Sequence, residues 1–326
     1  MIYSCPMIRE VFDLLKAQLS PNDTVVVGVS GGSDSTALLH LMVRLAKTYP
    51  LTIVVAHINH GLRGKASDAD ERWVRKLAGQ LGCECEVKKI SLSKKESGLE
   101  EKGREARRAF FERCAAKRGA AAIITAHTED DQLETMVFNF FRGSGPAGLA
   151  GMKVRSGLYL KPLLGVKKSE LVSYLRRRKL SWRTDRSNTN LRFRRNLIRH
   201  KLLPVAEKIN PSLRLTLLRN RTIFDELTSW LEAEAETFLE VHRRGLQYFS
   251  RAAFLALPSA LRAAVLRHTY AHATGANYAL SQKRLAELER LLERGVGNKR
   301  IIVAGGEFVL TGNWLSFTPF AKQPRG

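Results

Sequence analysis

Cysteine is scarce in this sequence of 326 residues. There are four cysteines, and none forms a CxxC pair or has the spacing of a zinc site. This argues against a zinc or iron–sulfur centre and predicts a cytoplasmic protein whose thiols stay reduced. The four are Cys5, Cys83, Cys85 and Cys114.

Long apolar runs are also missing. No run approaches the roughly 18 residues needed to span a bilayer, so we expect no membrane segment. Residues 11–19 have an amphipathic helical pattern, interrupted by Asp13 and Lys16, that is unlike a signal peptide. The hydrophobic content of 44% is ordinary for a chain with a sizeable core. At about 150 residues per domain, the length predicts two domains.

Acidic residues are few compared with basic ones. Lys and Arg number 54 and Asp and Glu 31, a net charge of +23. This excess of positive charge favours a polyanionic binding partner, most of all a nucleic acid and, after that, an anionic membrane surface. The alternative is a basic enzyme that does not bind RNA. In residues 176–201, Trp182 and Phe193 lie among arginines, and Asp185 is the one acid. Basic residues interleaved with aromatics are typical of RNA contact.

A glycine-rich loop follows the apolar residues 25–29 and precedes a helical pattern that starts at Thr36. A strand, a glycine turn and a helix start in this order point backbone N–H groups at an anion. Glycines allow a phosphate to approach closely, and a carboxylate there requires a cation such as Mg²⁺ between itself and the phosphate. A plain Gly-Gly turn is the alternative. The loop consists of Ser30, Gly31, Gly32, Ser33, Asp34 and Ser35.

This loop differs from two common phosphate-binding loops. It lacks the Gly-Lys-Ser/Thr of the Walker A sequence and the GxGxxG of dinucleotide-binding folds. Since no lysine is present to grip the β- and γ-phosphates, the loop favours chemistry other than γ-phosphoryl transfer.

Apolar segments alternate with helical patterns over the first half of the chain. This alternation predicts an α/β fold with a doubly wound, mostly parallel sheet whose strands are buried on both faces. Polar residues follow each predicted strand, and ligands bind at the carboxyl ends of strands in such sheets. The predicted strands are residues 24–29, 51–56, 83–90 and 120–125, and the polar segments are residues 30–35, 57–64, 91–103 and 127–131.

An acidic cluster follows the fourth predicted strand. His127, Asp131 and Glu134 have the spacing of one helical face. Acidic residues also suit a helix N-terminus because of its dipole, which is the plainer explanation. Beside a bound nucleotide, Asp131 could join Asp34 in holding Mg²⁺, and His127 or Glu134 could transfer a proton.

The remainder of the chain predicts a second, smaller domain. A helical pattern starts at residue 213, so we place the domains at residues 1–212 and 213–326. The second is expected to be mainly helical and to end in a β-hairpin joined by Gly305 and Gly306. Its expected helices are residues 251–257, 259–272 and 281–294, and its expected strands are residues 301–304, 307–310 and 313–317.

The loop at residues 30–35 resembles the pyrophosphate-binding loop of the N-type ATP pyrophosphatases, or PP-loop enzymes. Further segments resemble the tRNA(Ile)-lysidine synthetase family within that group, and they occur in the family's order. The chain departs from the family pattern at Arg108, where an aromatic residue is usual, and at Lys161, where arginine is usual. The segments are residues 57–70, 126–135, 142–152 and 185–200.

The resemblance implies a ligase that uses ATP and Mg²⁺. Its substrates would be L-lysine and the tRNA(Ile) with a CAU anticodon. ATP would adenylate the 2-carbonyl of the wobble cytidine and release pyrophosphate, and lysine would then displace AMP. The sequence leaves open whether His127 or Glu134 deprotonates the lysine amine, or whether Glu134 holds its ammonium. A homodimer is one candidate assembly.

The resemblance also carries roles to individual residues. Asp34 and Asp131 would hold the metal, and Arg195 or Arg199 could stabilise the adenylate phosphate through a planar guanidinium fork. The expected catalytic residues are Asp34, His127, Asp131, Glu134 and Arg195. The expected ATP-binding residues are Ser30, Gly31, Gly32, Ser33, Asp34, Ser35, His57 and Asn59. The expected tRNA or lysine contacts are Arg63, Arg104, Arg107, Arg142, Arg195 and Arg199.

Three other functions fit parts of the sequence. A tRNA 2-thiocytidine synthase shares the loop but typically needs CxxC cysteines, and an amidotransferase ligase needs a glutaminase unit as its ammonia source. A non-catalytic RNA-binding protein would explain the net charge of +23 without ATP. It would not explain polar clusters after four successive predicted strands.

Overall fold

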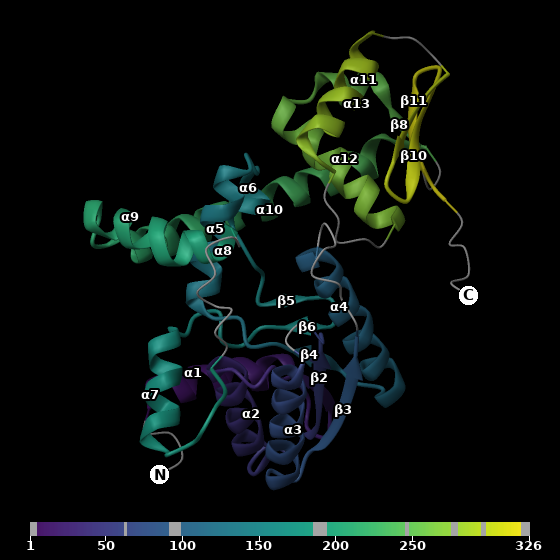
Figure 1. Cartoon of the computed structure of the whole chain (residues 1–326). Helices are drawn as coiled ribbons and strands as arrows, with labels where there is room; N and C mark the ends of the chain where they lie inside the picture. Colours follow the sequence, from purple (N-terminus) through teal and green to yellow (C-terminus); the bar gives the residue numbers. More distant parts are fainter. Residues whose placement is uncertain are drawn as a thin grey trace. The chain divides into compact units, whose positions relative to one another are not determined.

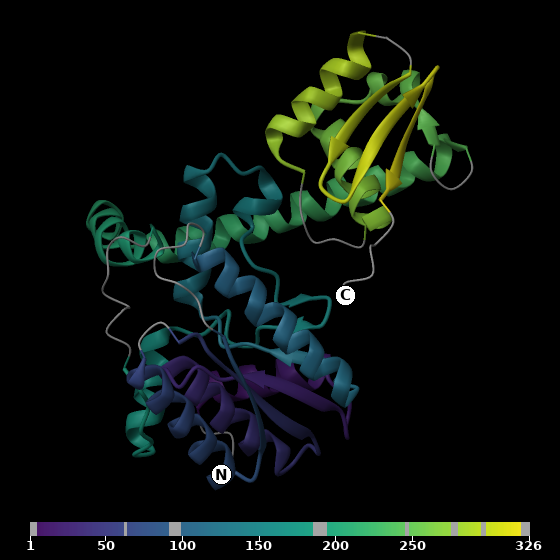
Figure 2. The ribbon, with the colours of Figure 1, turned by 45° about the vertical axis from the view of Figure 1, so that its right-hand side comes forward.

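The computed structural model describes residues 5–61, 64–90, 99–184, 194–244, 248–274, 280–294 and 298–320. The chain divides into two compact units, each built around its own sheet (Figures 1 and 2). Helices α5 (Glu129–Phe141) and α10 (Leu213–His242) each contribute to both units. The first unit comprises Met1–Asn139 and Gly151–Leu217, and the second comprises Phe140–Ala150 and Leu218–Gly326.

A six-stranded sheet in the order β3-β2-β1-β4-β6-β5 forms the centre of the first unit. All neighbouring pairs are parallel except β5 with β6, which confirms the predicted doubly wound, mostly parallel α/β fold. Because β1 lies between β2 and β4, the loops that follow these three strands share one edge of the sheet. The strands are β1 (Thr24–Gly28), β2 (Thr52–Asn59), β3 (Glu84–Lys89), β4 (Ala122–Ile124), β5 (Arg155–Ser156) and β6 (Tyr159–Leu160).

Helices cover both faces of this sheet. Val25 and Val27 of β1 belong to one buried cluster, and Val26 belongs to another that includes Phe111. Burial on both faces explains the unbroken apolar runs. A Cβ on Gly28 would lie 2.8 Å from the Phe111 ring, so only glycine lets α4 approach this closely. The other helices of this unit are α1 (Pro6–Gln18), α2 (Ser33–Ala46), α3 (Lys65–Gln80), α4 (Leu99–Arg118), α7 (Lys168–Arg177), α8 (Arg194–Leu197) and α9 (Leu203–Ile209), with a π-helical turn at Ile198–Leu202.

The second unit packs helices against an antiparallel sheet in the order β7-β8-β11-β10-β9. Its core includes Phe249, Phe308 and Phe317. The predicted terminal hairpin is confirmed, but the sheet is larger than predicted because two short strands join its edge. The strands are β7 (Arg243–Arg244), β8 (Tyr248–Ser250), β9 (Lys299–Val303), β10 (Gly306–Thr311) and β11 (Trp314–Pro319), and the helices are α6 (Pro146–Leu149), α11 (Arg251–Ala256), α12 (Ser259–Thr274) and α13 (Gln282–Arg294).

Helix α10 has 30 residues, and charged side chains recur along it. Neither this helix nor any other in the described ranges is long and apolar enough to cross a membrane.

Candidate active site

The glycine-rich loop connects β1 to α2. The helix begins at Ser33, three residues before the predicted start, so Asp34 lies in its first turn. The Ser35 hydroxyl accepts a hydrogen bond from the Ser30 amide at 3.2 Å and donates one to the Gly32 carbonyl at 3.2 Å. Gly31 has a φ of +93°, a conformation that favours glycine. These contacts fix a tight turn whose backbone faces the carboxyl edge of the sheet.

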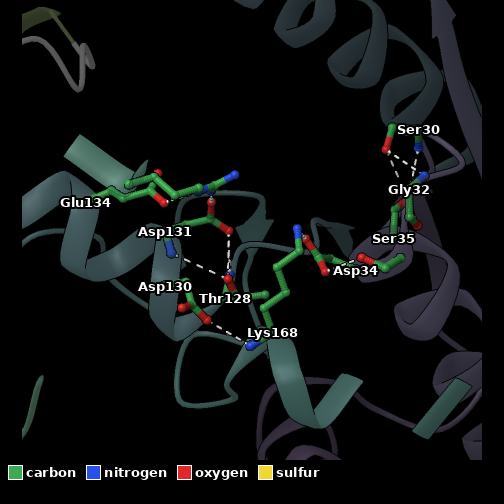
Figure 3. A network of polar contacts seen from close by, with 11 residues as sticks. Ser30, Gly32, Asp34, Ser35, Thr128, Asp130, Asp131, Glu134 and Lys168 are labelled. Atoms are coloured by element: carbon green, nitrogen blue, oxygen red, sulfur yellow. Dashed lines mark hydrogen bonds and ion pairs between the residues drawn. The ribbon is translucent and has the colours of Figure 1, made fainter. Parts of the chain in front are cut away.

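Asp34 is held by two hydrogen bonds. Its Oδ1 accepts from the Ser33 hydroxyl at 2.8 Å, and its Oδ2 accepts from the Lys168 ammonium at 2.9 Å. Figure 3 shows the Lys168 side chain extended toward Asp34, beside the network around Asp131. Sequence reasoning missed Lys168, because nothing in a local pattern links residues 134 positions apart.

The acidic cluster lies at the start of α5. Thr128 and Asp131 form a capping box: the Thr128 amide donates to Asp131 Oδ2 at 2.9 Å, and the Asp131 amide donates to the Thr128 hydroxyl at 3.4 Å. Since α5 begins at Glu129, His127 precedes the helix, and the expected helical face shared by His127, Asp131 and Glu134 is wrong. The His127 Nδ1 instead contacts the Thr125 hydroxyl at 3.0 Å.

Arg199 links the two carboxylates of α5. Its Nη2 donates to Asp131 Oδ1 at 3.1 Å, and its Nε forms a hydrogen-bonded ion pair with Glu134. The Glu134 side chain is only 2% exposed. Burial raises the pKa of Glu134, and the Arg199 guanidinium opposes that rise. Asp34 also acts electrostatically on Arg199, although its hydrogen bonds are with Ser33 and Lys168.

Three buried or half-buried histidines lie at this edge. His57 Nδ1 is 2.8 Å from the Val29 carbonyl, which assigns the proton to Nδ1 and leaves Nε2 as an acceptor; no described residue bonds this Nε2. Burial lowers the pKa of His57. Burial and the neighbouring Arg107 lower the pKa of His60 to about 4. Burial lowers the pKa of His127 to about 4, although Asp131 acts in the opposite direction. All three imidazoles are therefore neutral near neutral pH.

Acid titration tests this electrostatic picture. The His60 and His127 rings should stay neutral until the pH falls to about 4, whereas in the unfolded chain they titrate near 6.5. Between about pH 4 and pH 6.5 the unfolded chain binds more protons than the folded protein, so acidification through this range lowers the free energy of unfolding. Above about pH 6.5 both states bind the same number of protons at these histidines, and they add no pH dependence to the free energy of unfolding. Ring C–H shifts measured by NMR, assigned with His60→Gln and His127→Gln, would contradict this picture if either ring titrated near 6.5.

The remaining predicted contacts fall in different places. Asn59 braces the segment after β2: its amide nitrogen donates to Asp68 at 2.9 Å and Glu71 at 3.0 Å, and its oxygen accepts from the Gly61 amide at 3.0 Å. Its role toward ATP stays a prediction.

The arginines that we expected to contact tRNA or lysine lie in different parts of the chain. Arg63 lies outside the described residues, and Arg142 belongs to the second unit. Arg104 and Arg107 are exposed on α4, and Arg195 is half-buried on α8.

Two further arginines near the site were also missed. The Arg183 amide donates to the Gly31 carbonyl at 2.9 Å, and its guanidinium bonds Asp70 at 2.8 Å, which places this residue over the glycine loop. Arg214 of α10 bonds Asp130 at 2.9 Å. Arg183 lies within the basic segment, residues 176–201, for which the sequence predicted RNA contact. No local sequence pattern indicates that Arg214 pairs with Asp130.

The donor chemistry of the site suits Mg²⁺ together with a nucleotide. Among the described residues, no group of three or more His, Cys, Asp and Glu side chains is placed to hold a metal ion by itself. Mg²⁺ usually takes one or two carboxylates and completes its shell with phosphates and water. Asp34 and Asp131 fit that need, and each now accepts a hydrogen bond from a cationic side chain.

Comparisons with known proteins match both units. Residues 6–206 match a family model described as a PP-loop domain, and residues 249–315 match one described as the TilS substrate binding domain. PP-loop proteins use ATP, which supports nucleotide binding at the loop.

Three curated relatives are each named tRNA(Ile)-lysidine synthase. The protein of Chlorobaculum tepidum is 38% identical over 229 residues, which cover 68% of this chain and 68% of the relative. The protein of Geobacter sulfurreducens is 40% identical over 238 residues, covering 71% of this chain and 50% of the relative. The protein of Solibacter usitatus is 42% identical over 195 residues, which cover 59% of this chain and 43% of the relative.

A solved structure has the same fold at lower identity. The U34-tRNA thiolase NcsA from Methanococcus maripaludis with its [4Fe-4S] cluster aligns with a TM-score of 0.55 and 19% identity, over 67% of this chain and 78% of that chain. At this identity the likeness concerns the fold alone.

Proposed function

The chain belongs to the tRNA(Ile)-lysidine synthase family, a family of ligases with a PP-loop domain, and from this premise we propose its reaction. It joins free L-lysine to the 2-position of the wobble cytidine of the tRNA(Ile) with a CAU anticodon, at the expense of ATP. One observation carries the proposal: the loop carboxylate Asp34 pairs with Lys168, while Asp131 and Glu134 pair with Arg199, on which Asp34 also acts electrostatically.

The reaction has two bond-forming steps. The cytidine O2 attacks the α-phosphorus of ATP, the bond from that phosphorus to the bridging oxygen breaks, and pyrophosphate leaves. The ε-amine of lysine then bonds to C2 with loss of a proton, the C2–O bond breaks, and AMP leaves with that oxygen. Backbone N–H groups of the loop would bind the departing pyrophosphate. Mg²⁺, held by Asp34 and Asp131, would offset the phosphate charge.

The buried carboxylate of Glu134 suits the lysine substrate. It already forms a hydrogen-bonded ion pair with the Arg199 guanidinium, and a carboxylate that binds one cation can bind an ammonium in the same way. With Glu134 engaged in this manner, His127 becomes the group that accepts the amine proton. Burial lowers the pKa of His127 to about 4, so its ring is neutral near neutral pH, and the neighbouring Asp131, which raises that pKa, would stabilise the ring when it takes up the proton.

Transfer of labelled lysine tests the reaction. The protein is incubated with ATP, Mg²⁺, labelled lysine and unmodified tRNA(Ile) with the CAU anticodon, and label should accumulate in the tRNA with release of equal amounts of AMP and pyrophosphate. The same tRNA with the wobble cytidine replaced by uridine serves as the control and should stay unlabelled. Failure to label the cytidine-containing tRNA contradicts the proposal.

Two further features complete the proposal. The cysteine usage supports a cytoplasmic location, which fits a tRNA substrate. A homodimer remains a prediction, and light scattering of the full chain would test it.

A further inference from the structure

Lys168 places a cation beside a phosphate loop that has no lysine of its own. Its ammonium lies 2.9 Å from Asp34 Oδ2 (Figure 3). Lys168 is the first residue of α7, and α7 packs against α2, the helix that carries Asp34. Leu171 and Leu175 of α7 lie in the same buried cluster as Leu38 of α2. Packing of the two helices therefore fixes where the lysine can reach.

The backbone of Lys168 is held by a hydrogen bond to Asp130, while its side chain is partly exposed to solvent. Its amide donates to Asp130 Oδ2 at 2.8 Å, and the preceding Lys167 amide donates to Glu170 Oε2 at 3.1 Å. The Lys168 side chain itself is 39% exposed. Its partner Asp34 is 21% exposed, and an ion pair that is partly open to water adds only modestly to stability because the solvent screens it. The ammonium can therefore change partners at small cost.

We propose that Lys168 is a phosphate-binding residue that exchanges Asp34 for the β- and γ-phosphates of ATP. Asp34 would release the ammonium when it coordinates Mg²⁺, since a carboxylate oxygen that binds the metal is a poorer acceptor for a second cation. The ammonium is then repelled by the metal and attracted to the phosphates. This inference rests on the proposed function, because it assumes that ATP occupies the loop.

The chemistry of lysine suits this exchange. Its ammonium is a compact charge on a flexible four-carbon stem, and it binds phosphate as a point charge. The loop offers a phosphate backbone amides and hydroxyls but no cationic side chain, so Lys168 would supply the positive charge that the loop lacks. Lys168 should accordingly recognise the two phosphates that leave as pyrophosphate, rather than the phosphate that stays with AMP.

Calorimetric titration with ATP, pyrophosphate and AMP tests the proposal on the full chain with Mg²⁺ present. Lys168→Met should weaken binding of ATP and pyrophosphate at least tenfold, or about 1.4 kcal/mol, and leave AMP binding unchanged. Lys168→Arg should restore part of the loss. Lys167→Met is the matched control: it removes the same charge from the neighbouring exposed residue and should leave all three affinities unchanged.

The contrary results separate this inference from the proposed function. Equal losses for ATP and AMP in Lys168→Met would mean that the lysine only supports the loop, and unchanged ATP affinity would mean that it does not touch the phosphates. Either result overturns the role of Lys168 while lysine transfer by the wild type still stands. No measurable ATP binding by the wild type would overturn both.

Discussion

Asp34→Ala is expected to abolish pyrophosphate release from ATP while leaving tRNA binding measurable. Asp34 is the one carboxylate in the glycine loop, so its removal takes away the group that would hold Mg²⁺ against the phosphates. Loss of metal-based charge stabilisation should slow the reaction by roughly 10³-fold or more, about 4 kcal/mol. The sequence predicts that tRNA is bound by the basic residues in 176–201 instead, and one loop residue should contribute little to that binding.

Two measurements and two further variants make this prediction specific. Pyrophosphate release is followed by a coupled assay, and tRNA affinity by filter binding. Asp34→Asn keeps the size of the side chain but not its charge, and should lose as much activity as the alanine variant. Asp13→Ala removes a surface partner of Arg9, whose ion pair is open to solvent, and should change neither quantity. If Asp34→Ala lost tRNA affinity as strongly as activity, the assignment of Asp34 to the ATP site would be wrong.

The fold was largely predictable because its signals are local. The run from Val25 to Val27 is fully buried, and such runs identify central parallel strands without any knowledge of their neighbours. Helix starts were harder to predict. The helical pattern of apolar residues begins at Thr36, so the sequence predicted that α2 starts there. In the structure Gly32 is the N-cap, because the Ser35 hydroxyl folds back onto the loop.

The site was predictable only where residues follow a strand. Asp34, Asp131 and Glu134 were predicted in this way, since the strand ends of a parallel sheet meet at one edge. Their cationic partners lie far along the chain: Lys168 is 134 residues from Asp34, and Arg199 is 65 residues from Glu134. Arg199 was expected from a family resemblance, and Lys168 was not expected at all. No periodic pattern encodes which distant side chain neutralises a given charge.

The ion pair between Arg199 and Glu134 should carry the largest effect on stability. Arg199→Ala leaves a carboxylate that is 2% exposed without its cation, and breaking a buried pair in this way costs about 3–5 kcal/mol. We expect the thermal midpoint of the first unit to fall by roughly 6–20 °C. Transfer of lysine to tRNA should be lost as well, because Arg199 no longer positions the Glu134 carboxylate that would hold the lysine ammonium.

A second substitution separates buried charge from lost packing. Arg199→Ala combined with Glu134→Gln replaces the unpaired carboxylate with a neutral amide, so the double variant should be more stable than Arg199→Ala while remaining unable to transfer lysine. Arg9→Ala is the control, because its carboxylate partner Asp13 is 63% exposed and water can solvate it; its midpoint should fall less. A double variant no more stable than Arg199→Ala would contradict the buried-charge explanation.

The pH dependence of the Arg199→Ala variant gives an independent check with a defined sign. Burial raises the pKa of Glu134 above its usual value of 4.5, and without the guanidinium nothing strong opposes that rise. The folded variant therefore binds a proton that the unfolded chain has already released. Its stability deficit relative to wild type should be largest at and above neutral pH and should shrink as the pH falls toward 4.5, where the unfolded chain also takes up the proton. A deficit that stays constant with pH would place the loss in packing instead of in the buried charge of Glu134.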